Sequence, residues 1–328
     1  MQAELLALYD PHRSSVVRRR GVSSDWDALA RELNSQIASL RDRRGEGLHV
    51  VLPPTTSPTA AGLIARARER FPRSSWYRHD PLDLDGRVGP DRVIDLSRAR
   101  AIVSLDADLF GPDPAGVRLA HDFAQARRES RDRASAGPGL FVAEAVPTPT
   151  GARADWRLAL RPGEMQTLAA AMASLAGADT ITPAISDEAQ AWLGRVEPAL
   201  RSAGAGAVVV AGEHQPPWVH SLCLAANLAL GSVGTSVTYI EPVEAFRQFA
   251  HPLAELRQAI DAGAGDWIIL VDVNPAYDAI ERDALIAGIR RARFSVHLGL
   301  HVDETAQVCE WHAPLTHDLE RGGCTGCG

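Results

Sequence analysis

The side chains best suited to chemistry gather near the C-terminal end of the chain. Imidazoles, carboxylates and a thiol lie close together there: His297, His301, His312, His317, Asp303, Glu304, Glu310 and Cys309. These are the groups that bind zinc in proteins. Side chains repeat every two residues along a strand, so we expect His297 and His301 to share one face of a strand. The spacing matches no closed zinc pattern, and we predict neither a metal site nor a catalytic residue in this stretch.

Other reactive groups are sparse. Cys324 and Cys327 form a CxxC pair in the last residues, which supplies two ligands where a cluster or structural zinc needs four. All 34 basic residues are arginine, so a Schiff-base lysine or a phosphate-loop lysine is excluded. No nucleophile elbow, HExxH or Walker A pattern occurs. We expect residues 321–328 to form an unstructured tail.

Four loops follow apolar strands and precede helices. They are residues 53–58, 106–114, 212–217 and 272–278. Backbone N–H groups at the helix starts behind such loops can hold an anionic phosphate. Spacing alone favours the other interpretation, in which the loops are ordinary strand-to-helix turns. Asp106 and Asp108 would repel a pyrophosphate at a few ångströms.

The glycines at 231–236 (GSVGTS) do not form a dinucleotide fingerprint. They follow a helix and precede none, so the GxGxxG pattern of nicotinamide-binding proteins is absent. Gly231 is best placed as a helix C-cap.

Strands that are apolar on both faces alternate with helices along most of the chain. This alternation favours a parallel sheet covered by helices on both faces. The fold class we predict is α/β, with two doubly wound, mostly parallel Rossmann-like lobes. A weak internal repeat supports it: VVLPPTTSPTAAGLIARA resembles VVVAGEHQPPWVHSLCLAA in layout, and AIVSLDADLFGPDP resembles IILVDVNPAYDAIE. The boundaries we expect are 1–46 (N-terminal helical segment), 47–182 (first lobe), 183–320 (second lobe) and 321–328 (tail).

Composition excludes several classes of function. The net charge is −7 and the basic residues are scattered, so we predict no nucleic-acid partner. The first residues lack the apolar core of a signal peptide. The longest apolar stretches are far below the ~18 residues that a membrane span needs. By itself the chain is expected to be soluble.

One stretch, residues 142–177, resembles a signature of the molybdopterin oxidoreductase superfamily. The Asn274–Pro275 turn and the Gly231–Gly234 spacing resemble parts of that superfamily's second nucleotide-binding lobe. Within 142–177, a strand that ends in a polar residue, a Thr-rich loop and an Arg-Pro-Gly-acidic turn carry the resemblance, through Glu144, Thr148, Ala154, Asp155, Arg161, Pro162, Gly163 and Glu164.

The chain is more similar to one branch, the molybdopterin-oxidoreductase-like half of the large iron–sulfur subunit of alternative complex III. Phrases such as LYDPHRS, SLDADLFGPDPAGVRLAHDFAQARR and SVHLGLHVDETAQVCEWHAPLTHDLE carry this resemblance, and such phrases span residues 8 to 320. The resemblance implies a respiratory electron-transfer complex that oxidises quinol. It implies iron–sulfur and haem subunits as partners, and a membrane-associated position on the periplasmic face.

The chain differs from that family in two features, and these differences limit the function that we expect. The chain has no CxxCxxC run for iron–sulfur clusters, and no Cys or Ser stands in a molybdenum-ligand context. We therefore expect a non-catalytic structural lobe of an oxidoreductase complex, with no complete active site and no cofactor of its own.

Two alternatives stay open. In one, the chain binds molybdopterin guanine dinucleotide as a molybdenum oxidoreductase fragment, with these residues in contact with the cofactor: Glu164, Gly212, Gly234, Asn274 and Pro275. In the other, it is a soluble α/β protein that binds some nucleotide.

Overall fold

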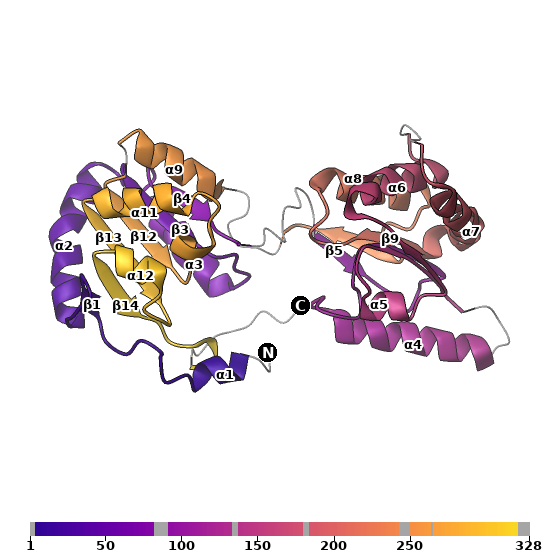
Figure 1. Ribbon diagram of the computed structural model, residues 1–328, viewed down its shortest axis with the longest axis horizontal. Coiled ribbons are helices and arrows are strands. Elements are labelled where there is room, and N and C mark those ends of the chain that lie inside the picture. The colour runs from indigo at the N-terminus through magenta and orange to yellow at the C-terminus, as the bar shows by residue number, and fades with distance from the viewer. Residues whose placement is uncertain are drawn as a thin grey trace. The chain divides into compact units, whose positions relative to one another are not determined.

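The computed structural model describes residues 4–81, 91–132, 137–179, 184–242, 249–263 and 265–320. The chain forms two compact units (Figure 1). Unit 1 consists of Met1–Asp83 and Val243–Gly328, and unit 2 is Leu84–Pro242. Unit 2 is therefore inserted into unit 1.

Unit 1 is built on one sheet whose order is β11-β4-β3-β12-β13-β14-β1-β2. Six neighbouring strands run parallel, and numbered along the chain their order is 3-2-1-4-5-6, the doubly wound arrangement. They are β3 (Leu48–Leu52), β4 (Ser75–Arg78), β11 (His251–Pro252), β12 (Trp267–Val271), β13 (Phe294–Gly299) and β14 (Trp311–Pro314). The short strands β1 (Arg18–Arg19) and β2 (Val22–Ser23) extend the sheet in antiparallel pairing.

Helices cover both faces of this sheet. On one face, α2 (Trp26–Asp42) and α3 (Pro58–Arg70) pack against a core that contains Trp267. On the other, α9 (Leu253–Asp261) and α11 (Arg282–Arg291) pack against Ile268, the next residue of the strand. Alternate side chains of a strand point to opposite faces, which explains the two cores. Short elements complete the unit: α1 (Glu4–Leu8), α10 (Pro275–Asp278), α12 (Glu304–Val308) and η2 (Asp318–Glu320).

Unit 2 has a four-stranded, fully parallel sheet with the order β8-β7-β6-β9. The strands are β6 (Ala101–Leu105), β7 (Gly139–Glu144), β8 (Trp156–Ala159) and β9 (Ala207–Ala211). One core joins this sheet to α6 (Pro162–Leu175), α7 (Asp187–Ala203) and α8 (Pro217–Ala229), and a second core joins it to α4 (Gly116–Asp132). An antiparallel pair, β5 (Asp91–Ile94) with β10 (Val237–Ile240), and the short α5 (Pro149–Ala152) and η1 (Gly204–Gly206) complete it.

The two sheets share one arrangement. The order β3-β12-β13-β14 of unit 1 corresponds to β9-β6-β7-β8 of unit 2. The helices that follow β3 and β9, α3 and α8, each have 13 residues and each start with proline, which suits a first helical position. These are the segments whose sequences resemble each other. The prediction of two doubly wound α/β lobes is confirmed.

The domain boundaries differ from those expected. β3 pairs with β12, so that His49 lies opposite Ile268, although the two strands were assigned to different lobes. The expected boundary at 182–183 falls inside unit 2, because β9 pairs with β6. The segment 1–46 is part of unit 1, since β1 pairs with β14 and Leu29 and Leu40 are buried. The apolar pattern of a strand indicates that the strand is buried, but not which strand pairs with it. The pairing decides which unit a strand belongs to, and so where the domain boundary lies. Residues 321–328, the expected tail, lie outside the described residues.

No helix among the described residues combines the length and the hydropathy that crossing a bilayer requires.

Candidate functional site

A pocket of about 470 Å³ opens in unit 1 at the carboxyl ends of β3, β4, β12 and β13. It lies where the strand order reverses, between β3 and β12, the usual ligand position of a doubly wound sheet. Two of the four loops singled out in the sequence meet here, through Pro53, Pro54, Asp272 and Asn274. Titratable residues dominate the rest of the lining: His79, Asp80, Asp278, His297, His301 and Asp303.

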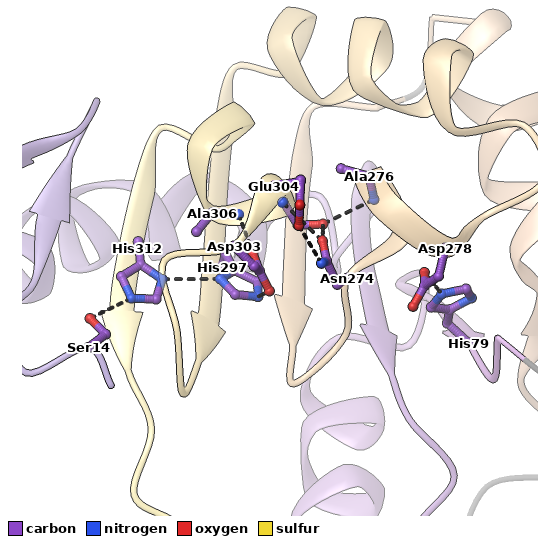
Figure 2. Close-up of polar contacts among 11 residues, drawn as sticks. Ser14, His79, Asn274, Ala276, Asp278, His297, Asp303, Glu304, Ala306 and His312 are labelled. Atoms are coloured by element: carbon purple, nitrogen blue, oxygen red, sulfur yellow. Dashed lines mark hydrogen bonds and ion pairs between the residues drawn. The ribbon is translucent and has the colours of Figure 1, made fainter. Parts of the chain in front are cut away.

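A buried pair of histidines stands at one side of this pocket. His297 lies opposite His312 on the neighbouring strand, and their Nδ1 atoms are 3.1 Å apart (Figure 2). The Nε2 atom of His312 is 2.8 Å from the hydroxyl of Ser14. Burial lowers the pKa of each imidazole to about 4. Both rings are therefore neutral near pH 7.

The ring of His297 is buried at the edge of the pocket. Its side chain is fully buried, and its Nε2 has no hydrogen-bond partner among the described residues. The nearest carboxylate oxygen is Oδ2 of Asp303, at 3.6 Å. Gly299 makes room for the ring, because a Cβ at that position would lie 2.4 Å from the Cε1 atom of His297.

The carboxylates of the pocket have structural partners as well. Asp278 lies 2.7 Å from the Nε2 atom of His79, and Asp80 pairs with Arg78 at 3.3 Å. Asp303 caps α12 by accepting from the N–H of Ala306, and burial raises its pKa. No arginine among the described residues contributes to the lining. The described lining is therefore rich in carboxylates, and the neutral imidazole of His297 lies beside them.

The histidine-rich stretch divides into separate places. His301 lies beyond the end of β13 and contacts Asp10, so the expectation that it shares a strand face with His297 is wrong. The strand ends at Gly299, before His301. His317 accepts from the backbone N–H of Leu319. Among the described residues, no three or more His, Cys, Asp and Glu side chains are arranged to hold a metal ion.

The cysteines do not join the site. Cys223 and Cys309 are buried and free, and burial raises the pKa of each thiol to about 12. Cys324 and Cys327 lie outside the described residues.

A compact hydrogen-bond network organises the turn after β12. Oδ1 of Asn274 accepts from the backbone N–H of Thr305 at 3.1 Å and from its hydroxyl at 2.7 Å. The same hydroxyl accepts from the N–H of Ala276 at 3.0 Å, and Nδ2 of Asn274 donates to Glu304. Figure 2 shows these contacts beside His297 and Asp303.

The turn after β6 in unit 2 repeats that network. Oδ1 of Asp108 accepts from the N–H of Thr150 at 3.1 Å and from its hydroxyl at 2.7 Å, and the hydroxyl accepts from the N–H of Phe110 at 3.0 Å. The N–H groups of Phe110 and Ala276 lie in two of the four loops where the sequence left phosphate binding open. In the structure they donate to the chain's own side chains.

At the strand-order reversal of unit 2, between β6 and β9, side chains from the loop after β9 contact Asp106. Oδ2 of Asp106 lies 2.8 Å from Nε2 of His214 and accepts from Nε2 of Gln215 at 3.1 Å. Oδ1 of Asp106 accepts from the N–H of Ala145 at 3.1 Å. A Cβ at Gly212 would lie 2.2 Å from the carbonyl oxygen of Asp106, so this glycine serves close packing of the two strand ends.

The five residues named for a pterin dinucleotide do not form one group. Asn274 and Pro275 belong to unit 1, where Pro275 is buried at the start of α10. Glu164, Gly212 and Gly234 belong to unit 2. Glu164 accepts from the N–H of Arg161 and so caps α6.

Gly212 and Gly234 lie at opposite ends of β9. Gly212 follows the carboxyl end of the strand. Gly234 takes a positive φ of 84° in a turn near the amino end, where the neighbouring Ser236 donates to the carbonyl of Ala207.

Glu144, from the stretch that resembles the superfamily signature, is a buried carboxylate. It is 1% exposed and accepts from Arg157 and from the hydroxyl of Thr148. A Cβ at Gly151 would lie 1.9 Å from its Oε1 atom. In this chain the residues that resemble the superfamily signature therefore stabilise the turn after β7.

Sequence reasoning missed His79, Asp278 and the Ser14–His312 contact. These residues come from distant parts of the chain, and no local pattern marks their meeting. The repeat between AIVSLDAD and IILVDVNP was the one signal that pointed to the two matching turns.

No protein-family model matches the chain, and no curated protein sequence is significantly similar to it. Among solved structures, the chain is similar to acetylene hydratase from Pelobacter acetylenicus, with a TM-score of 0.65 and 13% identity over 96% of this chain and 57% of that one. It is also similar to the formyltransferase/hydrolase complex from Methylorubrum extorquens, solved with methylofuran, with a TM-score of 0.54 and 15% identity over 92% of this chain and 86% of that one. The chain thus spans little more than half of the acetylene hydratase chain. At these identities the likeness shows a shared α/β fold alone.

Proposed function

We propose that this chain is a non-catalytic, molybdopterin-oxidoreductase-like structural lobe of a respiratory complex that oxidises quinol. Its packed α/β units hold neighbouring subunits in position and carry no redox step of their own. The observation that supports this most is the twin hydrogen-bond network. At the turns after β6 and β12, the backbone N–H groups of Phe110, Thr150, Ala276 and Thr305 already have acceptors within the chain.

A pterin dinucleotide fits these turns poorly. Its pyrophosphate needs N–H or cationic donors and avoids carboxylates. In unit 2 it would meet Asp106 and Asp108, whose oxygens hold the turn together. In unit 1 it would meet Asp272 and Asp303 in a pocket that no arginine lines in the part of the chain that the structure describes. The residues at these turns therefore do not fit molybdopterin guanine dinucleotide.

The partners in this proposal are iron–sulfur and haem subunits of a membrane complex, on its periplasmic face. Support comes from the resemblance in sequence to alternative complex III, which extends over residues 8 to 320. The structural likeness to acetylene hydratase is compatible with such an origin at the level of fold.

Affinity purification of the full-length tagged chain from its source cells tests the proposal. We expect it to elute from detergent-solubilised membranes together with haem-bearing and cluster-bearing subunits, which visible absorbance and mass spectrometry identify. A parallel purification from cells with the untagged chain controls for non-specific capture. Recovery of the chain alone from the soluble fraction would contradict the proposal.

The remaining alternative, a nucleotide-binding α/β protein, has a separate test. If the lobe is a scaffold, GDP, GTP or NAD should leave the midpoint of thermal unfolding of the purified chain unchanged. A ligand that binds only the folded state raises the midpoint, so a saturable upward shift would favour nucleotide binding instead.

A further inference from the structure

The last parallel strand at one end of each sheet occupies the same place, and both strands begin with a tryptophan. β8 starts at Trp156 and β14 starts at Trp311, and each of these residues lies opposite the third residue of the neighbouring strand. Further along, Leu160 and Leu315 donate their N–H groups to the last residue of that neighbouring strand, at 3.2 and 3.0 Å. The edges of the two sheets at β8 and β14 are therefore equivalent.

In unit 1 another segment of the chain covers this edge. β1 pairs antiparallel with β14, so that Arg19 lies opposite Trp311. The N–H of Arg20 donates to the carbonyl of Glu310 at 2.7 Å, and the guanidinium of Arg19 lies 5.1 Å from the centre of the Trp311 ring. Trp311 is 1% exposed. An antiparallel strand is thus the partner that this edge accepts in unit 1.

The equivalent edge of unit 2 is exposed. No second strand pairs with β8 in the part of the chain that the structure describes. Because Leu160 donates towards β7 and backbone groups alternate sides along a strand, Arg157 and Ala159 direct their N–H and C=O groups away from β7. Trp156 is 44% exposed, although the guanidinium of Arg195 lies 3.7 Å from the centre of its ring. Such an edge is a template for a further strand.

The surroundings of this edge are basic. Residues 153–161 hold three arginines and one acid, so the stretch carries a net charge of +2 in a chain whose net charge is −7. The acid, Asp155, already pairs with Arg127. Arg153 and Arg161, which lie before and after β8, are exposed. A strand that carries carboxylates complements this charge.

We propose that the edge of β8 binds an extended, acidic segment of a partner protein, which joins the unit 2 sheet as an antiparallel strand. The backbone of this segment pairs with Arg157 and Ala159 as β1 pairs with β14, and its carboxylates lie near Arg153 and Arg161. In strand addition of this kind, main-chain hydrogen bonds supply affinity and side chains supply specificity. This interaction is separate from the scaffold role, and either can hold without the other.

Isothermal titration of the full-length chain with a short synthetic peptide of alternating glutamate and valine tests the proposal. We expect one peptide to bind per chain, because β1 covers the equivalent edge of β14, and the affinity should fall as salt is raised. Two control peptides separate charge from backbone pairing. The version with lysine in place of glutamate should not bind. The version with N-methylated backbone should bind about tenfold more weakly or worse, because it lacks the N–H donors.

Absence of binding by the acidic peptide at millimolar concentration overturns the proposal. Equal binding by the lysine peptide or by the N-methylated peptide also overturns it.

Two readouts locate the peptide on β8. Amide hydrogen exchange at Arg157 and Ala159 should slow when the acidic peptide is added. Ala159→Pro removes one N–H of the edge, and proline suits an edge strand and already stands at the equivalent position of β14, Pro314. This variant should weaken binding by about tenfold. Circular dichroism and the unfolding midpoint establish that it is folded. Full-strength binding by the folded variant contradicts the assignment.

A matched pair of arginine variants tests the charge. Arg153→Gln should weaken binding and reduce its dependence on salt. Arg98→Gln is the control, because Arg98 lies beside Gly206 at the start of β9, the opposite edge of the sheet, and it should leave the affinity unchanged. Equal losses in both variants overturn the assignment. A dimer in gel filtration that Ala159→Pro dissociates would also overturn it, since a second copy of the chain would then cover the edge.

Discussion

Burial, rather than pairing with a reactive neighbour, sets the protonation of the histidines and cysteines discussed below. His297 and His312 share one Nδ1–Nδ1 contact of 3.1 Å, so one ring donates and the other accepts. Burial keeps both neutral, because a charged imidazole loses its solvation in the core. A pair of neutral imidazoles holds β13 and β14 in register and presents no net charge to a partner.

Acid should destabilise unit 1 through this pair. In the unfolded chain each imidazole binds a proton near pH 6.5, whereas in the folded chain its pKa is about 4. The unfolded state therefore holds more protons between those values, and the free energy of unfolding falls as the pH drops from 6.5 towards 4, by ~2 kcal/mol per histidine. Urea titrations at a series of pH values measure this.

The control for that measurement is His312→Gln, which removes one of the two titrating rings. Its pH-dependent loss between pH 6.5 and 4 should be clearly smaller than that of the wild type. Equal losses in both proteins would show that other groups cause the effect.

The buried cysteines should be inert in the folded protein. Thiolate is the reactive form, and burial raises the pKa of Cys223 and Cys309 to about 12. After iodoacetamide treatment at pH 8, mass spectrometry should find both unmodified in the native chain and both modified in urea. Rapid native labelling of either one would contradict their burial.

At the scale of elements, one small motif closes the turn at a strand end in each unit. A buried threonine, Thr150 or Thr305, donates its hydroxyl to Asp108 or Asn274 and accepts a backbone N–H from Phe110 or Ala276. The motif ties α5 to the turn after β6, and α12 to the turn after β12.

Thr150→Val and Thr305→Val should each lower the free energy of unfolding by ~1–3 kcal/mol. Valine keeps the shape but leaves a buried N–H without an acceptor. Thr59→Val, at an exposed position of α3, is the matched control and should change stability by less than about 0.5 kcal/mol. Unequal effects at Thr150 and Thr305, with one near zero, would show that the two turns are not equivalent.

Much of the fold was predictable from local patterns. Continuous apolar runs such as 48–52 and 101–105 marked β3 and β6, and the Pro-containing turn after β3 marked the edge that holds the pocket. β5 was missed because its four residues, Asp91–Ile94, include two charged ones and lie in a stretch that favours loop. The pairing of β3 with β12 was missed because hydrophobicity indicates burial and says nothing of the partner. The pocket residues come from strand ends far apart in sequence, so only that pairing brings them together.

At the scale of the whole molecule, the chain leaves unit 1 after β4 and returns to it before β11. Residues of unit 2 form one continuous segment with its own two cores. Unit 1 needs both of its segments, because β12 lies between β3 and β13 in the sheet.

This nesting predicts which fragments fold. Residues 84–242 alone should give a folded protein with cooperative unfolding, since they contain every strand of the β8-β7-β6-β9 sheet. Residues 47–182, the lobe expected from the sequence, lack both β9 and β12 and should stay unfolded. Circular dichroism and amide dispersion in NMR spectra distinguish the two, and a folded 47–182 fragment would contradict the strand pairing.

The central claim is that the two α/β units carry no pterin chemistry. Its most direct test is the molybdenum and pterin content of the full-length chain purified from its source cells, by elemental analysis and by fluorescence of oxidised pterin released on denaturation. The account predicts far less than one molybdenum and one pterin per chain. Stoichiometric pterin or molybdenum that survives gel filtration with the folded chain would contradict it.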